Sequence, residues 1–131
     1  MRFMSTLLHG VGDYIGSLVL IASPWLFGFA EGGVAQWLPV ALGALVLVYS
    51  LFTNFELGVF RVLPVSAHLA FDGAGGLLLA GSPWVFGFAD TVFVPHLVFG
   101  LLEIGASLTP LEIGASLTTR TRTGGPLLGR A

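Results

Sequence analysis

The chain has no cysteine and very few charged residues. Without cysteine there is no disulfide, no thiolate metal site and no cysteine nucleophile. Only 9% of the 131 residues are charged, whereas soluble domains carry roughly a quarter. Hydrophobic residues make up 55% of the chain, and the segment 37–53 holds no charge at all. Because a helix needs about 20 apolar residues to cross a bilayer, the composition predicts an integral membrane protein.

Signatures of several other protein classes are also missing. The five basic residues form no cluster of the kind that binds nucleic acid. The glycines are scattered through apolar segments and make no phosphate-binding loop. Asp13 interrupts the first apolar segment, which therefore does not resemble a cleavable signal. We expect no nucleic-acid partner and no enzymatic activity.

One octapeptide occurs twice in the chain. SPWLFGFA at 23–30 returns as SPWVFGFA at 82–89, identical at seven of eight positions and offset by 59 residues from Ser23 to Ser82. A repeat at a fixed offset indicates two copies of one structural unit. Proline lacks a backbone N–H and disfavours helix at the preceding residue, so each Ser-Pro pair is predicted to close a helix. The two serines are interpreted as helix caps and not as nucleophiles.

The aromatic residues of the octapeptides are predicted to lie at the membrane interface, where amphipathic rings concentrate. This predicted collar consists of Trp25, Phe27, Phe29, Trp84, Phe86 and Phe88. The full repeat motif adds the Ser-Pro pairs Ser23, Pro24, Ser82 and Pro83.

Four apolar segments predict four membrane-spanning helices, over about 5–22, 36–53, 64–81 and 92–109. Each would span roughly 25 to 30 Å, and Pro39 would fall in the first turn of the second helix. The predicted fold class is all-α, a four-transmembrane-helix bundle made of two tandem parallel helical-hairpin repeats. The repeats cover about 5–53 and 64–109 of a membrane domain 1–110. Glycines are predicted to let helices 1 and 3 approach closely; they are Gly12, Gly16, Gly73, Gly75 and Gly76.

Arginine placement predicts the orientation in the membrane. All five arginines fall on one side of the predicted helices: Arg2, Arg61, Arg120, Arg122 and Arg130. Arginine in short loops marks the cytoplasmic side, so both termini are predicted inside and the aromatic turns outside. An even number of spans per repeat predicts a pseudo-two-fold axis along the membrane normal. A second duplication, LEIGASLT at 102–109 and 111–118, leads into a tail 111–131 that is predicted to be cytosolic and disordered.

The repeated Ser-Pro-Trp turn resembles that of the SPW-repeat family of small prokaryotic membrane proteins. The resemblance rests on residues 23–25 and 82–84, with a helix before and after each, and extends over about 7–108. It implies a four-span protein of the bacterial or archaeal plasma membrane. It implies no catalytic residues, and the C-terminal tail departs from the pattern.

Ionisable side chains inside the predicted helices follow the same repeat. His9 and Asp13 are matched by His68 and Asp72 at the offset of 59 residues. In each pair the two residues are four apart, on one helical face. The two aspartates lie roughly 12 Å from the cytoplasmic ends and Glu103 roughly 9 Å, so three carboxyls are predicted to share one layer. A lipid-facing charge costs about 3 kcal/mol, so Asp13 and Asp72 are predicted to face protein.

Three interpretations of this polar set stay open. Each Asp is neutralised by its own His or bonded to a neighbouring helix, a contact worth about 1 kcal/mol. Alternatively, Asp13, Asp72 and Glu103 form a proton or ion site, since close carboxyls in a low dielectric can share a proton. As a third possibility, His9 and His68 hold haem, a pigment or a metal. His96 is predicted to be interfacial.

The first interpretation makes the chain a structural or accessory membrane subunit with no activity of its own. Its expected partners are the lipid bilayer and other membrane subunits or a second copy of itself, and it is expected to hold no metal and no cofactor. The alternatives are a small ion or proton conductor, or a haem- or pigment-binding protein.

Overall fold

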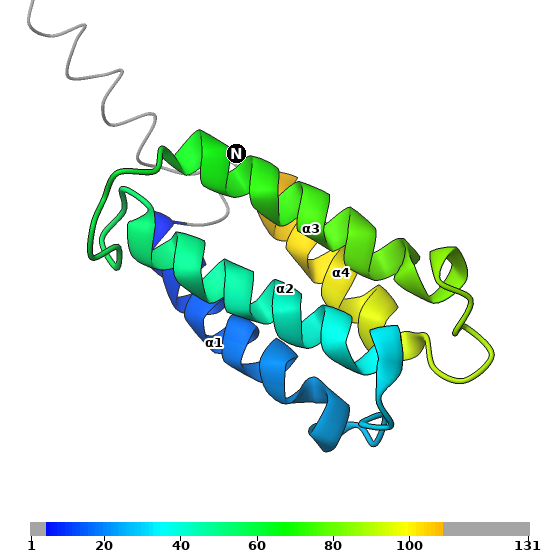
Figure 1. Ribbon diagram of the computed structural model, residues 1–131. Helices are drawn as coiled ribbons and strands as arrows, with labels where there is room; N and C mark the ends of the chain where they lie inside the picture. The colour runs from blue at the N-terminus through cyan, green and yellow to red at the C-terminus, as the bar shows by residue number, and fades with distance from the viewer. Residues whose placement is uncertain (1–4, 109–131) are drawn as a thin grey trace, which may run out of the picture.

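The computed structural model describes residues 5–108, and over that range it contains four α-helices and no strand. They are α1 (Thr6–Leu26), α2 (Gly33–Phe52), α3 (Val65–Val85) and α4 (Val94–Leu108). Consecutive helices form two hairpins, α1 with α2 and α3 with α4 (Figure 1). The predicted all-α fold of two helical-hairpin repeats is confirmed. The predicted tail at 111–131, with the second LEIGASLT copy, lies outside the described residues.

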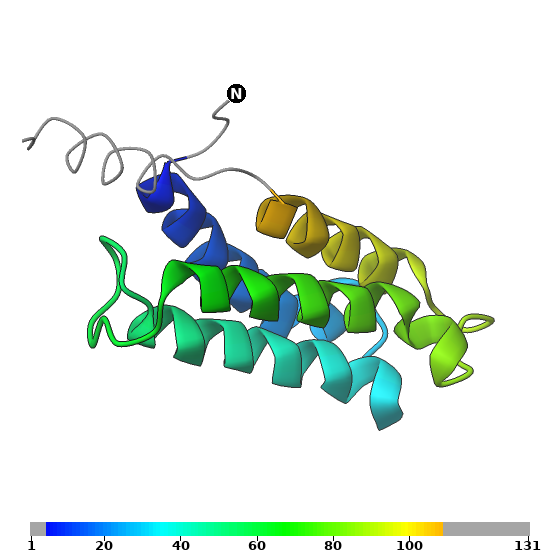
Figure 2. The ribbon, with the colours of Figure 1, turned by 90° about the horizontal axis from the view of Figure 1, so that it is seen from above.

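The two hairpins pack within themselves much more than against each other. They meet chiefly where α2 and α3 lie side by side, and α1 touches α4 over a smaller area (Figure 2). The start of α1, the connection between α2 and α3 and the end of α4 lie at one end of the bundle, and the two Ser-Pro-Trp turns lie at the other (Figure 1). We call these the inner end and the outer end.

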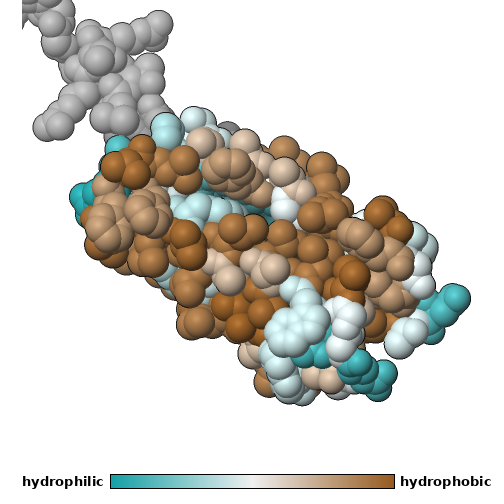
Figure 3. All heavy atoms as spheres, viewed as in Figure 1, coloured by the Kyte–Doolittle hydropathy of each residue, from teal (hydrophilic) through white to brown (hydrophobic). Residues whose placement is uncertain are grey.

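The outer surface of the bundle is apolar, while many of its buried positions are polar. Each helix exposes large hydrophobic side chains, such as Ile15, Leu45, Leu77 and Leu101. Figure 3 shows hydrophobic residues over most of one face, with hydrophilic residues at the ends and in a narrow strip between α2 and α3. Two of the helices, α1 and α2, are long and apolar enough to cross a membrane. This distribution suits a protein whose surroundings are lipid.

The first Ser-Pro pair does not close its helix, contrary to the prediction. Pro24 lies inside the last turn of α1, which continues to Leu26. Proline has no N–H for the carbonyl four residues back, which is that of Leu20. The Ser23 hydroxyl donates to that oxygen instead, at 2.7 Å. The serine thus replaces the hydrogen bond that the proline removes, and the helix runs on.

The second copy is built in the same way. The Ser82 hydroxyl donates to the Leu79 carbonyl at 2.7 Å, beside Pro83, and α3 continues to Val85. Both serines are fully buried, so water does not reach these carbonyls. The predicted end of the third helix was therefore also one turn too early.

The single glycine of each octapeptide lies two residues after the end of its helix. Gly28 and Gly87 each have a φ of +75°, in the left-handed region that side chains disfavour. The phenylalanine after each glycine then donates its backbone N–H to the proline carbonyl at 2.8 Å, Phe29 to Pro24 and Phe88 to its counterpart. A bond across this span after a left-handed glycine is the Schellman motif. The serine, proline and glycine of the repeat together make one helix terminus.

The six aromatic residues of the predicted collar separate into two groups. The group that stays exposed, as expected for an interface, is Trp25, Phe27, Trp84 and Phe86. Phe29 is only 7% exposed and Phe88 is half-buried, so for these two the interfacial prediction is wrong. The Schellman turn causes the difference, because it reverses the chain and directs the residue after the glycine back toward the bundle.

His96 packs against Phe29 and Phe88 at the outer end. Its ring centroid lies 5.0 Å from that of Phe29 and 4.9 Å from that of Phe88. The prediction that His96 is interfacial is wrong, since the residue is 1% exposed. Its Nε2–H donates to the Ala35 carbonyl of α2 at 2.7 Å. That carbonyl is free because α2 begins earlier than predicted, which places Pro39 well inside the helix and removes the N–H that would bond to it.

The close glycine contacts lie within each hairpin. A Cβ on Gly100 would come within 2.5 Å of the Ala80 nitrogen and 2.6 Å of the Gly76 oxygen. A Cβ on Gly43 would lie 2.9 Å from the Ser17 carbonyl oxygen. These positions bring α4 onto α3 and α2 onto α1.

The predicted glycine contact between α1 and α3 is wrong. A Cβ on Gly12 or Gly16 would meet no atom within 4 Å. Gly73 and Gly76 face α4, and Gly75 has only one side-chain atom at 4.0 Å. Of the five predicted packing glycines, only Gly73 and Gly76 lie closely against another helix, and the spacing did not identify that helix as α4.

Candidate functional site

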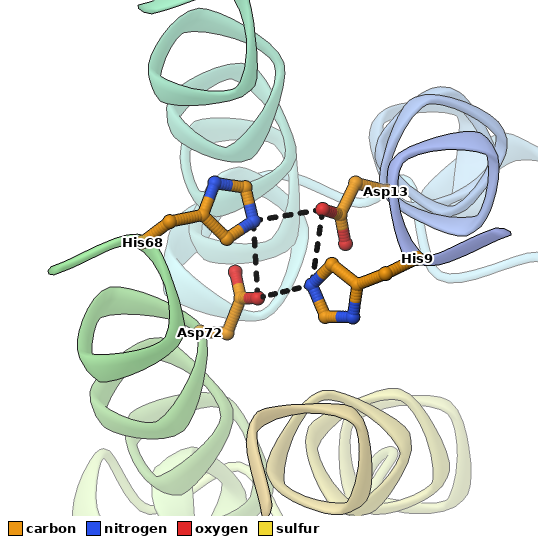
Figure 4. Close-up of side chains that lie close together, drawn as sticks. All are labelled: His9, Asp13, His68 and Asp72. Carbon is orange, nitrogen blue, oxygen red and sulfur yellow. Dashed lines mark hydrogen bonds and ion pairs between the residues drawn. The ribbon is translucent and has the colours of Figure 1, made fainter. Parts of the chain in front are cut away.

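Four ionisable side chains meet in the middle of the bundle. His9 and Asp13 lie one turn apart on α1, and His68 and Asp72 occupy the equivalent positions on α3. Their exposed fractions are 3%, 5%, 1% and 1%. Figure 4 shows all four pointing toward a common centre between the two helices. Both aspartates therefore face protein, as the cost of a charge in lipid requires.

The four side chains form a closed ring in which nitrogen and oxygen alternate. The Nε2 atom of His9 lies 3.2 Å from the Oδ2 atoms of both Asp13 and Asp72. The Nε2 atom of His68 lies 2.7 Å from Asp13 Oδ2 and 3.2 Å from Asp72 Oδ2. We call this set the four-residue ring. Each aspartate contacts the histidines of both repeats. The contacts within one helix are therefore only half of the contacts in the ring.

Two side chains of α2 support the second-repeat half of the ring. The Thr53 hydroxyl donates to the Tyr49 carbonyl at 2.6 Å, so its oxygen accepts a hydrogen from Nδ1 of His68 at 2.7 Å. This fixes a proton on Nδ1 of His68 and leaves Nε2 directed at the ring. The Tyr49 hydroxyl donates to Oδ1 of Asp72, the carboxylate oxygen outside the ring.

The first-repeat half of the ring lacks such support. The Nδ1 atom of His9 is buried and has no hydrogen-bond partner among residues 5–108. No helix of the described range supplies it with the equivalent of Thr53. The ring is therefore symmetric in its four members and asymmetric in what surrounds them.

The connection between α2 and α3 closes the ring from the inner end. Phe55 is 4% exposed, and its ring centroid lies 5.6 Å from that of His68. Two hydrogen bonds hold the connection on α1: the Thr6 hydroxyl donates to Glu56 at 2.6 Å, and the Tyr14 hydroxyl donates to the Leu57 carbonyl at 2.8 Å.

Apolar residues close the ring from the outer end. The next interior layer consists of Leu20, Val46 and Leu79, which are 3%, 6% and 1% exposed. Beyond it lie the packed rings of Phe29, His96 and Phe88. Among residues 5–108, these apolar residues cover the ring at both ends, and one mainly apolar cavity reaches Asp72 between α2 and α3.

Glu103 does not join the ring, although the sequence places it at a similar depth. It is half-buried on α4 and makes no hydrogen bond or ion pair with any residue in 5–108. It lines a cavity of about 460 Å³ between α2 and α3, together with Tyr49 and Asp72. Only two of the three predicted carboxyls therefore join the ring, and the third lines the cavity beside it.

Tyr49 and Thr53 were missed by the sequence analysis. The sequence did contain a signal for them, because both are polar in a segment without charged residues. They are four residues apart and so lie on one helical face. The same spacing marks the two His-Asp pairs.

A bundle of short apolar-surfaced helix hairpins with a polar centre is the pattern of a small membrane protein. The family model for the SPW repeat domain matches residues 7–110 of this chain. The chain therefore belongs to the SPW repeat family, which confirms the resemblance seen in its octapeptides. The match spans both octapeptides and all members of the four-residue ring. No curated protein and no solved structure matches the chain.

Proposed function

We propose that the chain is a four-span protein of the plasma membrane that serves as a structural or accessory subunit of a larger membrane complex and catalyses no reaction. The observation that carries this proposal is the buried polar centre that joins the two hairpins. The four-residue ring links α1 to α3 and is covered by Phe55 toward the inner end. Such a cross-link suits a scaffold, because it fixes the two hairpins relative to each other.

Purification from native membranes in mild detergent tests the accessory role. We expect the chain to migrate with at least one other membrane protein at constant stoichiometry. The comparison is the same chain expressed in a host that lacks this family. Migration as a lone chain or a simple homo-oligomer in both preparations would contradict an accessory role in a larger complex.

The proposed topology places both termini in the cytoplasm. It is supported by Arg61, which lies in the connection at the inner end and donates to the carbonyls of Gly58 and Glu56 at 3.1 and 3.2 Å. The chain contains no cysteine, so single cysteines report on accessibility without background. With a membrane-impermeant maleimide, Asp90→Cys should label in intact cells and Val59→Cys only after lysis. The opposite pattern would invert the topology.

The runner-up, a small proton or ion conductor, is disfavoured because Phe55 covers the ring toward the inner end and the cavity beside the ring is lined mainly by apolar side chains. Proton flux into liposomes separates the two functions. We expect wild-type protein to conduct no faster than empty liposomes. Flux that is present in the wild type and lost in Asp13→Asn and Asp72→Asn would establish the conductor in place of the scaffold.

A haem or pigment between His9 and His68 is the third candidate. The ring centroids of these histidines are 5.4 Å apart, and both Nε2 atoms face carboxylate oxygens within 3.2 Å. A planar macrocycle between the histidines would have to displace both aspartates. No observation in the described range favours this candidate.

A further inference from the structure

We propose that the four-residue ring binds one divalent transition-metal ion of the zinc type. The ligands are Nε2 of His9, Nε2 of His68 and one Oδ2 each of Asp13 and Asp72. This goes beyond the proposed accessory function, which assigns no ligand to the chain. The leading interpretation of the sequence expected no metal, and a metal held by His9 and His68 was its third alternative; the convergence of one atom from each of four side chains now favours a site that includes both aspartates.

The spacing of the four atoms suits such an ion. Each residue offers one ligand atom, and these atoms all lie within 4.8 Å of one another. Zinc bonds nitrogen and oxygen at about 2.0 to 2.2 Å, so the ligand atoms of a tetrahedral site lie about 3.3 to 3.6 Å apart. Neighbours in the ring are 2.7 to 3.2 Å apart. Binding a tetrahedral ion therefore requires neighbouring ligand atoms to separate by a few tenths of an ångström, and it requires the four atoms, which lie within 4.8 Å of one another, to rearrange from a ring into a tetrahedron.

Hydrogen counting shows that the centre of the ring needs positive charge. Because Thr53 fixes a proton on Nδ1 of His68, the neutral imidazole directs a lone pair at Asp13 Oδ2 from 2.7 Å. Two lone pairs at this distance repel each other unless a proton or a cation lies between them. One divalent ion satisfies all four contacts at once. With two carboxylates and two neutral imidazoles it also gives a net charge of zero, as an apolar bundle interior favours.

On the second-repeat side, the residues around the ring are those that metal ligands require. A metal-binding histidine donates its other ring N–H to a neighbouring acceptor, and a metal-binding carboxylate is itself hydrogen-bonded. Thr53 does the first for His68, and Tyr49 does the second for Asp72. Asp72 also lines the cavity that carries Glu103, which offers an approach for the ion from the bundle surface.

The ligand set selects among metals. Two imidazoles with two carboxylates, all from protein, suit a closed four-coordinate site such as zinc occupies in structural centres. Calcium takes six to eight oxygen ligands and magnesium six, which this ring does not provide. The ion would link α1 to α3, the two helices that share no glycine contact, and would thereby join the two repeats.

Metal titration of the purified full-length chain in detergent tests the proposal. After removal of metal with a chelator, we expect one Zn²⁺ or Co²⁺ per chain, a higher unfolding temperature and the visible absorption of four-coordinate Co²⁺. Mg²⁺ and Ca²⁺ should produce none of these changes. A folded wild-type chain that takes up no stoichiometric Zn²⁺ or Co²⁺ would overturn the proposal and leave a ring held by protons alone.

Variants separate the ring from nonspecific binding. Asp13→Asn and Asp72→Asn should each weaken Zn²⁺ binding by at least about 100-fold, and Tyr49→Phe by about 10- to 100-fold. Asp90→Asn removes an exposed aspartate far from the ring and should leave the affinity unchanged. If the aspartate variants do not fold, Tyr49→Phe decides the question. Equal affinities for Tyr49→Phe, Asp90→Asn and the wild type would place the ion elsewhere.

Discussion

The serine of each Ser-Pro pair should stabilise the protein only because a proline follows it. In the Ser23→Ala variant the Leu20 carbonyl would keep no donor, since Pro24 has no N–H and the site is fully buried. An unsatisfied buried polar group costs about 1 to 3 kcal/mol in general, and hydrogen bonds inside membrane proteins average about 0.6 kcal/mol. We therefore expect Ser23→Ala to lower the free energy of unfolding by about 1 kcal/mol.

A double-mutant cycle with Pro24→Ala isolates this effect. Alanine at position 24 restores an N–H that can bond to the Leu20 carbonyl, which makes the Ser23 hydroxyl redundant. In the Pro24→Ala background, Ser23→Ala should therefore cost close to nothing, a coupling of about 1 kcal/mol. The assay is reversible unfolding in mixed micelles, followed by helical circular dichroism. Ser82 and Pro83 provide an independent repetition of the experiment in the same chain.

A matched control is available in α2. Ser50 is fully buried like Ser23, but its hydroxyl has no hydrogen-bond partner in the described range. Ser50→Ala should leave stability unchanged or raise it, because it removes an unpaired polar group. Additive costs of Ser23→Ala and Pro24→Ala would refute the compensation of proline by serine. Equal losses in Ser50→Ala and Ser23→Ala would show that only side-chain volume matters.

Three further predictions concern packing. Gly100→Ala should lower the free energy of unfolding by about 1 to 3 kcal/mol, because the added Cβ clashes with α3. Gly12→Ala should raise it by about 0.5 to 1 kcal/mol, because a Cβ there meets no atom within 4 Å. Phe55→Ala should lower the free energy of unfolding by about 3 to 5 kcal/mol. It should also speed hydrogen exchange at the start of α3, since the substitution uncovers the four-residue ring; unchanged exchange would contradict the covering role of Phe55. His96→Ala should destabilise the outer end by about 1 kcal/mol, and Pro39→Ala should remove that cost; a cost that persists would show that His96 acts only by packing.

The number and order of the helices could be predicted from the sequence because these features depend on local sequence patterns. Apolar length sets the helices, and the offset of 59 residues sets the two hairpins. The inward orientation of Asp13 and Asp72 was also predictable, because a charge facing lipid is costly whatever the helices pack against. Each of these predictions needs only one segment and its surroundings.

One error was local: the helix-breaking rule for proline failed because the neighbouring serine supplies the missing donor. The other errors arose where two distant segments decide the outcome. His96 was placed at the interface because nothing near it in sequence reveals that its partner is the carbonyl freed by Pro39 on another helix. The sharing of Asp13 and Asp72 between repeats likewise depends on how the hairpins meet, which no pattern within one helix specifies.

The four-residue ring also shows how the two repeats have diverged. A duplicated hairpin supplies the same His-Asp pair twice, and the ring closes only when both copies meet. Among residues 5–108, the supporting hydroxyls come from one copy: Tyr49 lies on α2 and Thr53 caps its C-terminus, while α4 contains no tyrosine or threonine between residues 94 and 108. His68 and Asp72 are thereby fixed in orientation, whereas Nδ1 of His9 has no partner in the described range. The first-repeat side of the four-residue ring is therefore the less constrained side. We expect any conformational change at the four-residue ring to involve the side chains of α1 before those of α3.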